Sequence, residues 1–486
     1  MKKSGWILLP AAFFLLINFS ISSVKLLFFT RLIYFLFLIS LFFFLRRFDI
    51  SKILKAVVGG ISIVVFSYGI LQKFVLFPIY LERFKPGDNF YSLAVISRIQ
   101  SGRIFSIFRL PTLYAIICAV LILFLFHYML RAPLLKYKVL WGLLLLPGLF
   151  NLVLTQSFGG IIYLTAGLLA YLLLSGILKL KYLAPVLMTL VLFLSITIAL
   201  RFQEARKLEP VKLRFSNWVQ AVRAFSAGPF WGVGLGNYES SVSFFTHHDE
   251  ARSIYAHNFF LQFTAETGII IPLFLLLLLF LSRKKLKPRV KNDNETVLHI
   301  SIFLILLTYN LIDIGFYFFP AGLAGVIALS RIYPSENREF KLNLVVLVLL
   351  AALLSLNALS ENYRGEGDLL MNQGYAADAE INYKKSITVN PFNFKTLMAY
   401  SKLELSRNDL EKAEKKLARS LDIYPDSSFS HFLMSEIQLK KGHLVQAFFH
   451  AAHAHQKNII DSTCQNWYLE IKKHLEARQQ KTQEIK

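Results

Sequence analysis

Residues 111–130 read PTLYAIICAVLILFLFHYML and contain no lysine, arginine, aspartate or glutamate. A helix needs about 20 predominantly apolar residues to cross the hydrocarbon core of a bilayer, and this stretch supplies them. Similar runs lie at about 6–22, 26–45, 53–72, 138–156, 159–178, 182–200, 259–281, 297–313, 315–331 and 342–359. The sequence therefore predicts an all-α, polytopic membrane protein of about eleven transmembrane helices.

The composition of the whole chain agrees with this prediction. Of its 486 residues, 55% are hydrophobic and 17% are charged, whereas about 25% are charged in a typical soluble domain. The net charge of +23 would suit nucleic acid or an anionic membrane surface, and the apolar runs decide for the membrane. The two cysteines, Cys118 and Cys464, are too few for a disulfide framework.

The positions of lysine and arginine predict which way the spans face. Basic clusters in short loops lie near 46–55, 131–138, 179–181, 283–291 and 331–341. With Lys2 and Lys3 inside and eleven spans, all of these clusters fall in the cytoplasm, as the positive-inside rule requires. The C-terminal segment then lies outside the cytoplasm. Two longer loops, about 79–110 and 201–258, carry arginines on the outer face, where these suit either solvent or an anionic ligand.

The polar segment that begins near residue 361 contains an internal repeat. Three alanines recur with a step of 34 residues: Ala379, Ala413 and Ala447. Pro391 and Pro425 share this step, and the pattern is typical of TPR repeats. We therefore predict a transmembrane domain at 1–360, with a large extracytoplasmic loop at about 201–258, and a TPR-like helical domain at 361–486. Such a domain either binds a protein partner or packs on its own chain.

Ionisable residues gather at the end of the second loop. His257 lies just before an apolar run, and imidazole can accept a proton near neutral pH. A hydrogen-bonded structural histidine is the alternative. Glu266 falls inside the apolar run, where an ionisable group is costly and is a functional candidate. A buried hydrogen bond to the loop backbone is the alternative for Glu266.

Two other patterns in this loop predict no ligand site. Gly232, Gly234 and Gly236 match only part of a dinucleotide-binding fingerprint, and no strand precedes them. A tight turn that returns to the membrane surface is the better interpretation. The polar run at 247–250 lacks the spacing of metal ligands, so we predict no metal site.

The order of residues around this loop resembles the O-antigen ligase and polymerase superfamily. The resemblance rests on Arg214 and Trp218, Gly228-Pro229, the glycines at 232–236, Ala256-His257-Asn258, Glu266 and Gly268, with upstream elements from Arg98 to Ala115 and from Leu154 to Gly159. It covers roughly residues 90–330. Two positions depart from the family pattern: Phe158 replaces the usual arginine, and Thr112 follows Pro111 where asparagine is usual. Some members also carry C-terminal TPR repeats.

The resemblance implies a GT-C-like glycosyltransferase in a bacterial cytoplasmic membrane, acting in the biosynthesis of lipopolysaccharide or another polysaccharide. Such enzymes move a glycan from an undecaprenyl-diphosphate carrier to a hydroxyl of the lipid A core, a growing glycan or a protein. They work on the extracytoplasmic face without metal, cofactor or nucleic acid. Arg214 would hold the diphosphate, and His257 would act as the base or orient the acceptor. The residues implied to bind substrate are Arg98, Arg201, Arg206, Trp218, Asn258 and Glu266.

Two other classes of function remain open. A transporter or flippase of lipid-linked sugars would show broken or charged helices in mid-membrane and internal repeats. A membrane-anchored scaffold would work through its TPR-like tail. The gathering of candidate residues in an external loop favours the transferase over the transporter. The scaffold leaves the loop between Arg214 and His257 without a role.

Overall fold

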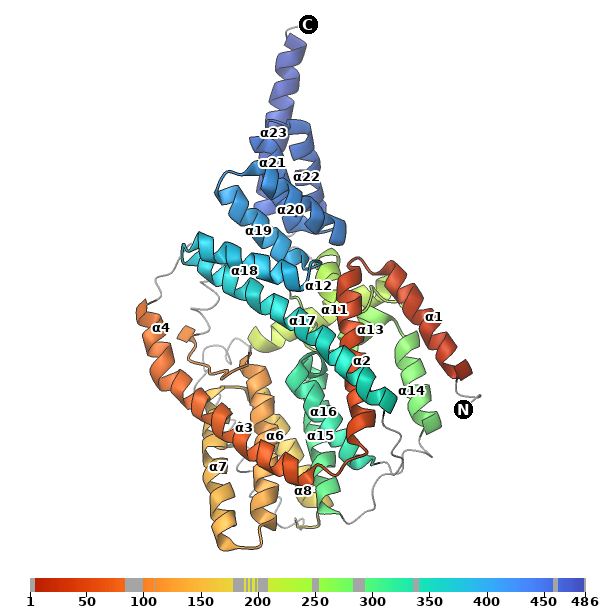
Figure 1. The fold of residues 1–486 in the computed structure, drawn as a ribbon, viewed down its shortest axis with the longest axis vertical. Helices are drawn as coiled ribbons and strands as arrows, with labels where there is room; N and C mark the ends of the chain where they lie inside the picture. The colour runs from red at the N-terminus through yellow and green to blue at the C-terminus, as the bar shows by residue number, and fades with distance from the viewer. Residues whose placement is uncertain are drawn as a thin grey trace.

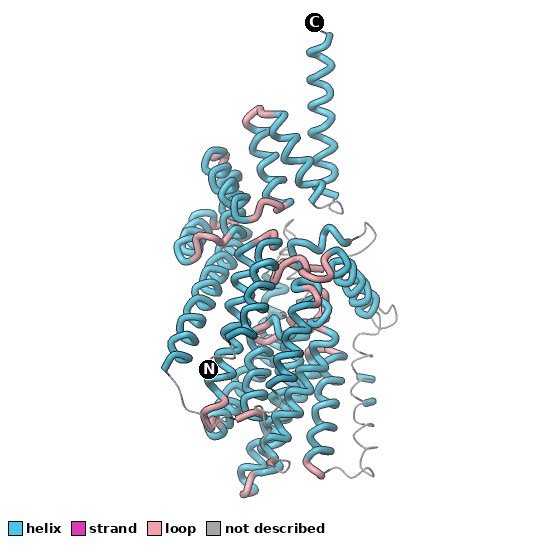
Figure 2. The backbone as a smooth tube through the Cα atoms, turned by 90° about the vertical axis from the view of Figure 1, so that its right-hand side faces the viewer, coloured by secondary structure: helices cyan, strands magenta, loops and turns pink. Residues whose placement is uncertain are grey.

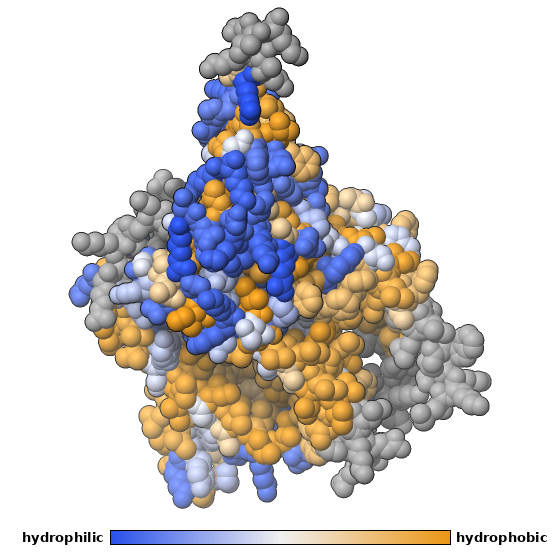
Figure 3. Space-filling model, turned by 45° about the horizontal axis from the view of Figure 1, so that its top comes forward, coloured by the Kyte–Doolittle hydropathy of each residue, from blue (hydrophilic) through white to orange (hydrophobic). Residues whose placement is uncertain are grey.

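The computed structural model describes residues 5–83, 99–108, 110–177, 209–246, 253–282, 293–334, 341–457 and 462–484, and isolated helical positions between 188 and 199. In these ranges every regular element is a helix (Figure 2). Figure 1 shows a broad body of long helices with a narrower helical stack above it. The body exposes a mainly hydrophobic surface and the stack a mainly hydrophilic one (Figure 3). The all-α membrane fold is thereby confirmed.

The body is built from the N-terminal two thirds of the chain. Its elements are α1 (Gly5–Ile21), α2 (Lys25–Leu45), α3 (Ser51–Leu71), η1 (Gln72–Leu76), α4 (Phe77–Arg83), α6 (Pro111–Arg131), α7 (Leu135–Leu154), α8 (Phe158–Leu174), α11 (Glu209–Ala227), α12 (Tyr238–Ser241), η3 (Val242–Phe245), α13 (Phe259–Thr267), α14 (Ile270–Ser282), α15 (Asn294–Ile312), η4 (Gly315–Tyr317) and α16 (Phe319–Ile332). The predicted span at 182–200 lies almost entirely outside the described residues.

The number of spans is smaller in the described part of the chain than the sequence predicts. Six helices there are long and apolar enough to cross a membrane, if α3 to α4 count as one. The number is seven if α13 and α14 form one broken span. Shorter apolar helices occur in α1, α8 and α16. A total of eleven spans therefore stays a prediction.

Helix α6 forms the centre of the body, packed by α3, α7, α8, α15 and α16. It begins at Pro111, a residue suited to the first helical turn because the amide it lacks would have no partner there. Some of the polar groups buried around α6 are paired with one another, which offsets the cost of placing them in an apolar environment. The Tyr114 hydroxyl donates to Asn151 Oδ1 (2.8 Å), and Asn151 Nδ2 donates to the Phe66 carbonyl (3.1 Å).

The run predicted as one span at 259–281 is broken in the structure. Helices α13 and α14 meet at an angle of 113°. Gly268 lies between them with φ +69°, and a Cβ at this position would overlap the carbonyl of Phe230. Only glycine therefore allows the loop at 228–236 to pack against the break.

Helix α17 (Lys341–Asn372) connects the body to the C-terminal stack and crosses the predicted boundary at residue 360 without interruption. Its apolar first half packs on α2. The stack continues with α18 (Ala376–Val389), α19 (Phe394–Ser406), α20 (Leu410–Ile423), α21 (Ser428–Lys440), α22 (Leu444–Lys457) and α23 (Ser462–Glu484). We call residues 361–457 and 462–484 the repeat domain. Helices α18, α20 and α22 begin 34 residues apart, the period seen in the sequence, while assignment to the TPR family stays a prediction.

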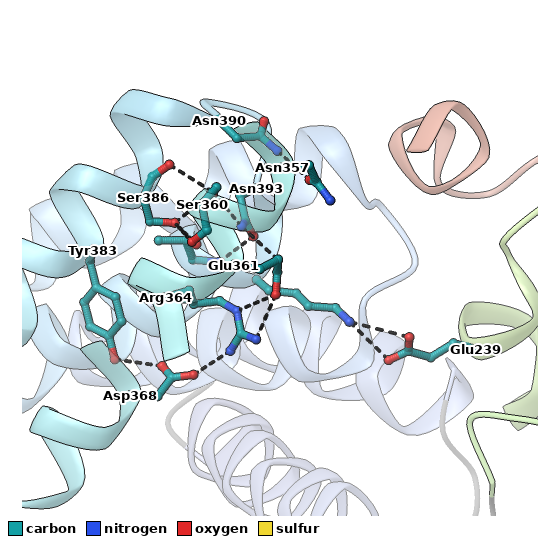
Figure 4. Close-up of polar contacts among 12 residues, drawn as sticks. Glu239, Asn357, Ser360, Glu361, Arg364, Asp368, Tyr383, Ser386, Asn390 and Asn393 are labelled. Carbon is teal, nitrogen blue, oxygen red and sulfur yellow. Dashed lines mark hydrogen bonds and ion pairs between the residues drawn. The ribbon is translucent and has the colours of Figure 1, made fainter. Parts of the chain in front are cut away.

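A buried polar network fixes the start of the repeat domain (Figure 4). The hydroxyls of Ser360 in α17 and Ser386 in α18 lie 3.0 Å apart, and both residues are fully buried. Asn393 Nδ2 donates to Ser360 Oγ (3.0 Å) and to Glu361 Oε1 (2.9 Å). Arg364 pairs with Glu361 on the same helix. Because separating buried, hydrogen-bonded polar groups is costly, this network holds α17 rigidly against the first helices of the repeat domain.

The repeat domain also rests on the segment formed by α12 and η3. The contacts include Lys395 Nζ to Glu239 Oε1 (3.3 Å), the Tyr424 hydroxyl to the Ser240 carbonyl (3.4 Å) and Lys457 Nζ to the Phe244 ring centroid (5.3 Å). The α12–η3 segment packs in turn on α11 and α13. The repeat domain therefore supports the part of the body that carries the candidate site.

Candidate active site

His257 pairs with an acidic residue that is distant in sequence. Its Nδ1 lies 3.2 Å from Asp313 Oδ1, with 31% of the histidine side chain and 2% of the aspartate side chain exposed. Asp313 follows the last turn of α15, and its Oδ1 also accepts the backbone N–H of Ile314 (2.9 Å). A carboxylate accepts hydrogen bonds, so Nδ1 of a neutral imidazole carries the proton in this pair. The partly exposed ring therefore presents Nε2 as an acceptor.

The backbone around His257 is held by its neighbours. His257 has φ +51°, an uncommon conformation for a residue other than glycine. Trp218 Nε1 donates to the His257 carbonyl (3.1 Å). Asn258 caps α13 by accepting from the Leu261 amide (3.0 Å) and donates to the Leu311 carbonyl (2.8 Å). Trp218 and Asn258 thus position the histidine, and their predicted contacts with substrate stay predictions.

Arg214 supplies a positive charge near two phenols, Tyr163 and Tyr309, that also feel the charge of Asp313. It lies half-buried on α11, close enough to the Tyr163 and Tyr309 phenols to interact electrostatically with both. Asp313 interacts electrostatically with the same two phenols. Arg214 forms no ion pair with any residue that the structure describes. Arg214 and Asp313 therefore act electrostatically on the same two phenols, which belong to α8 and α15.

Glu266 lies in a different environment. Its side chain is buried, and its carboxylate accepts hydrogen bonds from the Gly236 amide (2.7 Å) and the Tyr317 hydroxyl (2.7 Å). Its carbonyl accepts from Asn18 Nδ2 (2.8 Å) and the Gly234 amide (2.9 Å). These bonds tie the glycine-rich loop to α13, and they tie α13 to α1 through Asn18. They favour the structural role that the sequence leaves open for Glu266, and the predicted tight turn for the glycines.

Several predicted residues lie outside the described part of the chain: Arg98, Arg201, Arg206 and the polar run at 247–250. Among the residues that are described, no group of three or more His, Cys, Asp or Glu is arranged to hold a metal ion. The residues that sequence reasoning misses are Asp313, Tyr163 and Tyr309. Asp313 gave one signal, because it is a charged residue between two apolar runs.

Fold and site together define a helical membrane protein with a histidine–aspartate pair and an arginine. Figure 1 shows α11, which carries Arg214, and α13, which begins just after His257, at the end of the body that faces the repeat domain. Residues 143–278 match the family model of the O-antigen ligase domain. The matched stretch runs from α7 to α14 and contains Arg214 and His257, while Asp313 and the repeat domain lie beyond it. This match covers only part of the chain, and it confirms the resemblance to the O-antigen ligase/polymerase superfamily. No curated protein matches the chain.

Proposed function

We propose that the protein is a membrane glycosyltransferase that moves a glycan from an undecaprenyl-diphosphate carrier to a hydroxyl acceptor on the extracytoplasmic face. The observation that carries this proposal is the pair of His257 and Asp313, whose Nδ1 and Oδ1 atoms lie 3.2 Å apart. This transfer needs a base and a guanidinium, and among the described residues neither Nε2 of His257 nor the Arg214 guanidinium has an ion-pair partner. The O-antigen ligase domain supports a membrane transferase of the ligase or polymerase type.

The site suggests how the reaction proceeds. The acceptor oxygen attacks the anomeric carbon of the donor, and its proton passes to Nε2 of His257. The bond between that carbon and the diphosphate oxygen breaks, and the lipid diphosphate leaves with the bonding electrons. Arg214 stabilises the negative charge on the leaving group through charge-assisted hydrogen bonds. Asp313 holds the imidazole in place and stabilises the imidazolium that forms.

The arrangement of charge supports an external site. The turn between α6 and α7 lies at the end of the body opposite the repeat domain (Figure 1), and this turn contains one of the basic clusters of the sequence. Basic short loops face the cytoplasm, so we infer that the repeat domain lies outside the cytoplasm. The lipid-linked donor places the protein in a bacterial cytoplasmic membrane. The acceptor is a lipid A core, a growing glycan or a protein.

The break between α13 and α14 is a feature that transporters also use. Here the loop at 228–236 packs on it backbone to backbone, with hydrogen bonds from the Val233 amide to the Ala265 carbonyl and from the Ile269 amide to the Pro229 carbonyl (both 2.9 Å). The break therefore serves as an anchor for the loop, which favours the transferase.

The proposal is tested in a strain that lacks the gene and is complemented from a plasmid. Wild-type protein and a His474→Ala variant, which changes an exposed histidine of α23, should restore the surface glycans seen on a gel. A His257→Ala variant should reach the membrane in normal amount and restore none. Unchanged glycans in the deletion strain, together with unchanged protein glycosylation, would contradict the proposal.

A further inference from the structure

A buried glutamine on α13 connects the backbone next to His257 to Glu266. The Oε1 atom of Gln262 accepts the backbone N–H of Ala256 (3.1 Å), and its Nε2 donates to Glu266 Oε1 (3.1 Å). Both Gln262 and Ala256 are buried, and Ala256 directly precedes His257. Both polar ends of the glutamine are therefore used inside the protein, and one of them holds the turn that carries the proposed base.

Glu266 fixes which way the Gln262 amide points. Oε2 of the Glu266 carboxylate also accepts from the Gly236 amide and from the Tyr317 hydroxyl, both at 2.7 Å. A carboxylate that receives such donors is an acceptor, so the amide nitrogen of Gln262 faces it and the amide oxygen faces Ala256. The reverse orientation would place two donors against each other at Ala256 and two acceptors against each other at Glu266. Glu266 thereby keeps the glutamine oxygen aimed at the Ala256 N–H.

The backbone at His257 needs support from its neighbours. His257 has φ +51°, a conformation that is costly for a residue with a Cβ and persists where surrounding contacts impose it. After His257, the Phe259 amide donates to the Asp313 carbonyl (2.9 Å), which joins the start of α13 to the end of α15. Before His257, the bond from the Ala256 amide to Gln262 joins the turn to α13. The two bonds hold the backbone on either side of the residue whose Nδ1 meets Asp313.

We infer that Gln262 is a positioning residue for the proposed transfer, acting through the Ala256 amide on the direction in which His257 presents its ring. This inference rests on the proposed function and adds a residue to the same site. Without the bond, the backbone at His257 relaxes toward a more common conformation, and the imidazole moves out of the geometry that Asp313 imposes. The chemical step then slows, because a base must lie within hydrogen-bond reach of the proton it removes. Donor binding is unchanged, since Arg214 lies on a different helix.

The experiment measures the rate constant of single-turnover transfer by the purified full-length protein, together with the KM for the lipid-linked donor. Gln262→Met keeps an unbranched side chain of similar length and removes both hydrogen bonds. It should lower the rate constant about tenfold, the effect of roughly one hydrogen bond, while KM changes by less than about twofold. The rate constant of a single turnover does not depend on the fraction of protein that is folded, so a loss of stability alone leaves it unchanged. Hydrogen exchange at 253–258 should rise in the same variant, which reports release of the Ala256 amide.

Exchanging the two side chains provides a rescue. Glu266→Gln alone sets two amide nitrogens against each other or turns the Gln262 oxygen away from Ala256, so it should slow transfer as Gln262→Met does. Combined with Gln262→Glu, it restores the bonds: the carboxylate at position 262 accepts from Ala256 and from the amide nitrogen at position 266. The amide oxygen at position 266 accepts from Gly236 and Tyr317. The double variant should return to within about threefold of the wild-type rate constant, because the two positions act as one unit.

Gln438→Met is the matched control. Gln438 is buried in α21 and donates to Glu414 Oε1 (2.6 Å), so this variant loses a similar bond in the repeat domain. It should melt lower than wild type and keep the wild-type rate constant. An unchanged rate constant in Gln262→Met, with or without a raised KM, would overturn the inference and leave the proposed function intact. A double variant no faster than Glu266→Gln would also overturn it. If wild type itself transfers no glycan, the proposed function fails and the inference fails with it.

Discussion

Replacing Asp313 by asparagine should slow glycan transfer strongly while leaving the fold intact. The substitution keeps the shape of a side chain that is only 2% exposed and lies 3.2 Å from His257. An asparagine oxygen can still accept the Nδ1 proton and the Ile314 amide. What it loses is the negative charge that stabilises the imidazolium formed as the acceptor is deprotonated.

The magnitude follows from the distance between the two groups. Unit charges 3.2 Å apart attract by about 5 kcal/mol at an effective dielectric constant of ~20. His257 is partly exposed, so water screens part of this attraction. A loss of roughly 3 kcal/mol corresponds to a fall in kcat of about 100-fold.

The assay is single-turnover transfer by the purified protein with a saturating lipid-linked donor. His257→Ala should fall at least as far as Asp313→Asn, and the double variant should be no slower than His257→Ala, because the two residues act as one unit. If Asp313→Asn keeps kcat within about twofold of wild type, the aspartate plays no part in catalysis. A double variant much slower than His257→Ala would show that Asp313 acts independently of the histidine.

Three further predictions concern the diphosphate site and the repeat domain. Arg214→Lys should raise the KM for the donor about tenfold and lower kcat, because an ammonium group cannot form the bidentate hydrogen bonds of a guanidinium with phosphate. Unchanged kinetics would mean that the guanidinium of Arg214 has no specific role. The repeat domain should lose stability as pH falls from about 6.5 to 4. Burial lowers the pKa of His450 to about 4 and also lowers the pKa of His431, and their Nδ1 atoms are 2.9 Å apart. The folded state therefore keeps both rings neutral while the unfolded state takes up protons, at a cost on the order of 2 kcal/mol. Hydrogen exchange of α21 and α22 at pH 7 and pH 4.5 measures this, and equal protection at both values would refute it. Lys395→Glu should break the ion pair with Glu239 and increase hydrogen exchange in α12. Combining it with Glu239→Lys, which swaps the two charges, should restore the protection of α12. Unchanged exchange in the single variant would mean that this ion pair does not hold the repeat domain against the body.

Local sequence predicts most of the helices because each depends on the length and composition of its own apolar run. The runs at 111–130 and 138–156 became α6 and α7 within a few residues, and the 34-residue step reappears in the starts of α18, α20 and α22. The break at Gly268 could not be predicted in this way. The run at 259–281 is predominantly apolar and long enough for one span, and the bend depends on packing against the backbone of Phe230, which is distant in sequence.

In the candidate site, too, local sequence predicts some features, while others depend on residues that are distant in sequence. The motifs indicate Arg214 and His257, since guanidinium and imidazole are the groups that the chemistry needs. The pairing of His257 with Asp313 joins residues 56 positions apart, and the contact between the Tyr163 and Tyr309 rings joins two separate helices. Neither follows from local pattern. Trp218 and Asn258 carry residue types that suit a glycan, yet only the structure shows their bonds to the backbone around His257.

The central claim is that this protein transfers a glycan from a lipid diphosphate with His257 as the base. The most direct measurement incubates purified protein with an undecaprenyl-diphosphate-linked glycan and a hydroxyl acceptor, and follows release of the lipid diphosphate together with formation of the product. Wild type should release the lipid diphosphate and form the product in equal amounts. The His257→Ala variant should form no product, even though it should bind undecaprenyl diphosphate normally. Transfer by His257→Ala at the wild-type rate would contradict this claim.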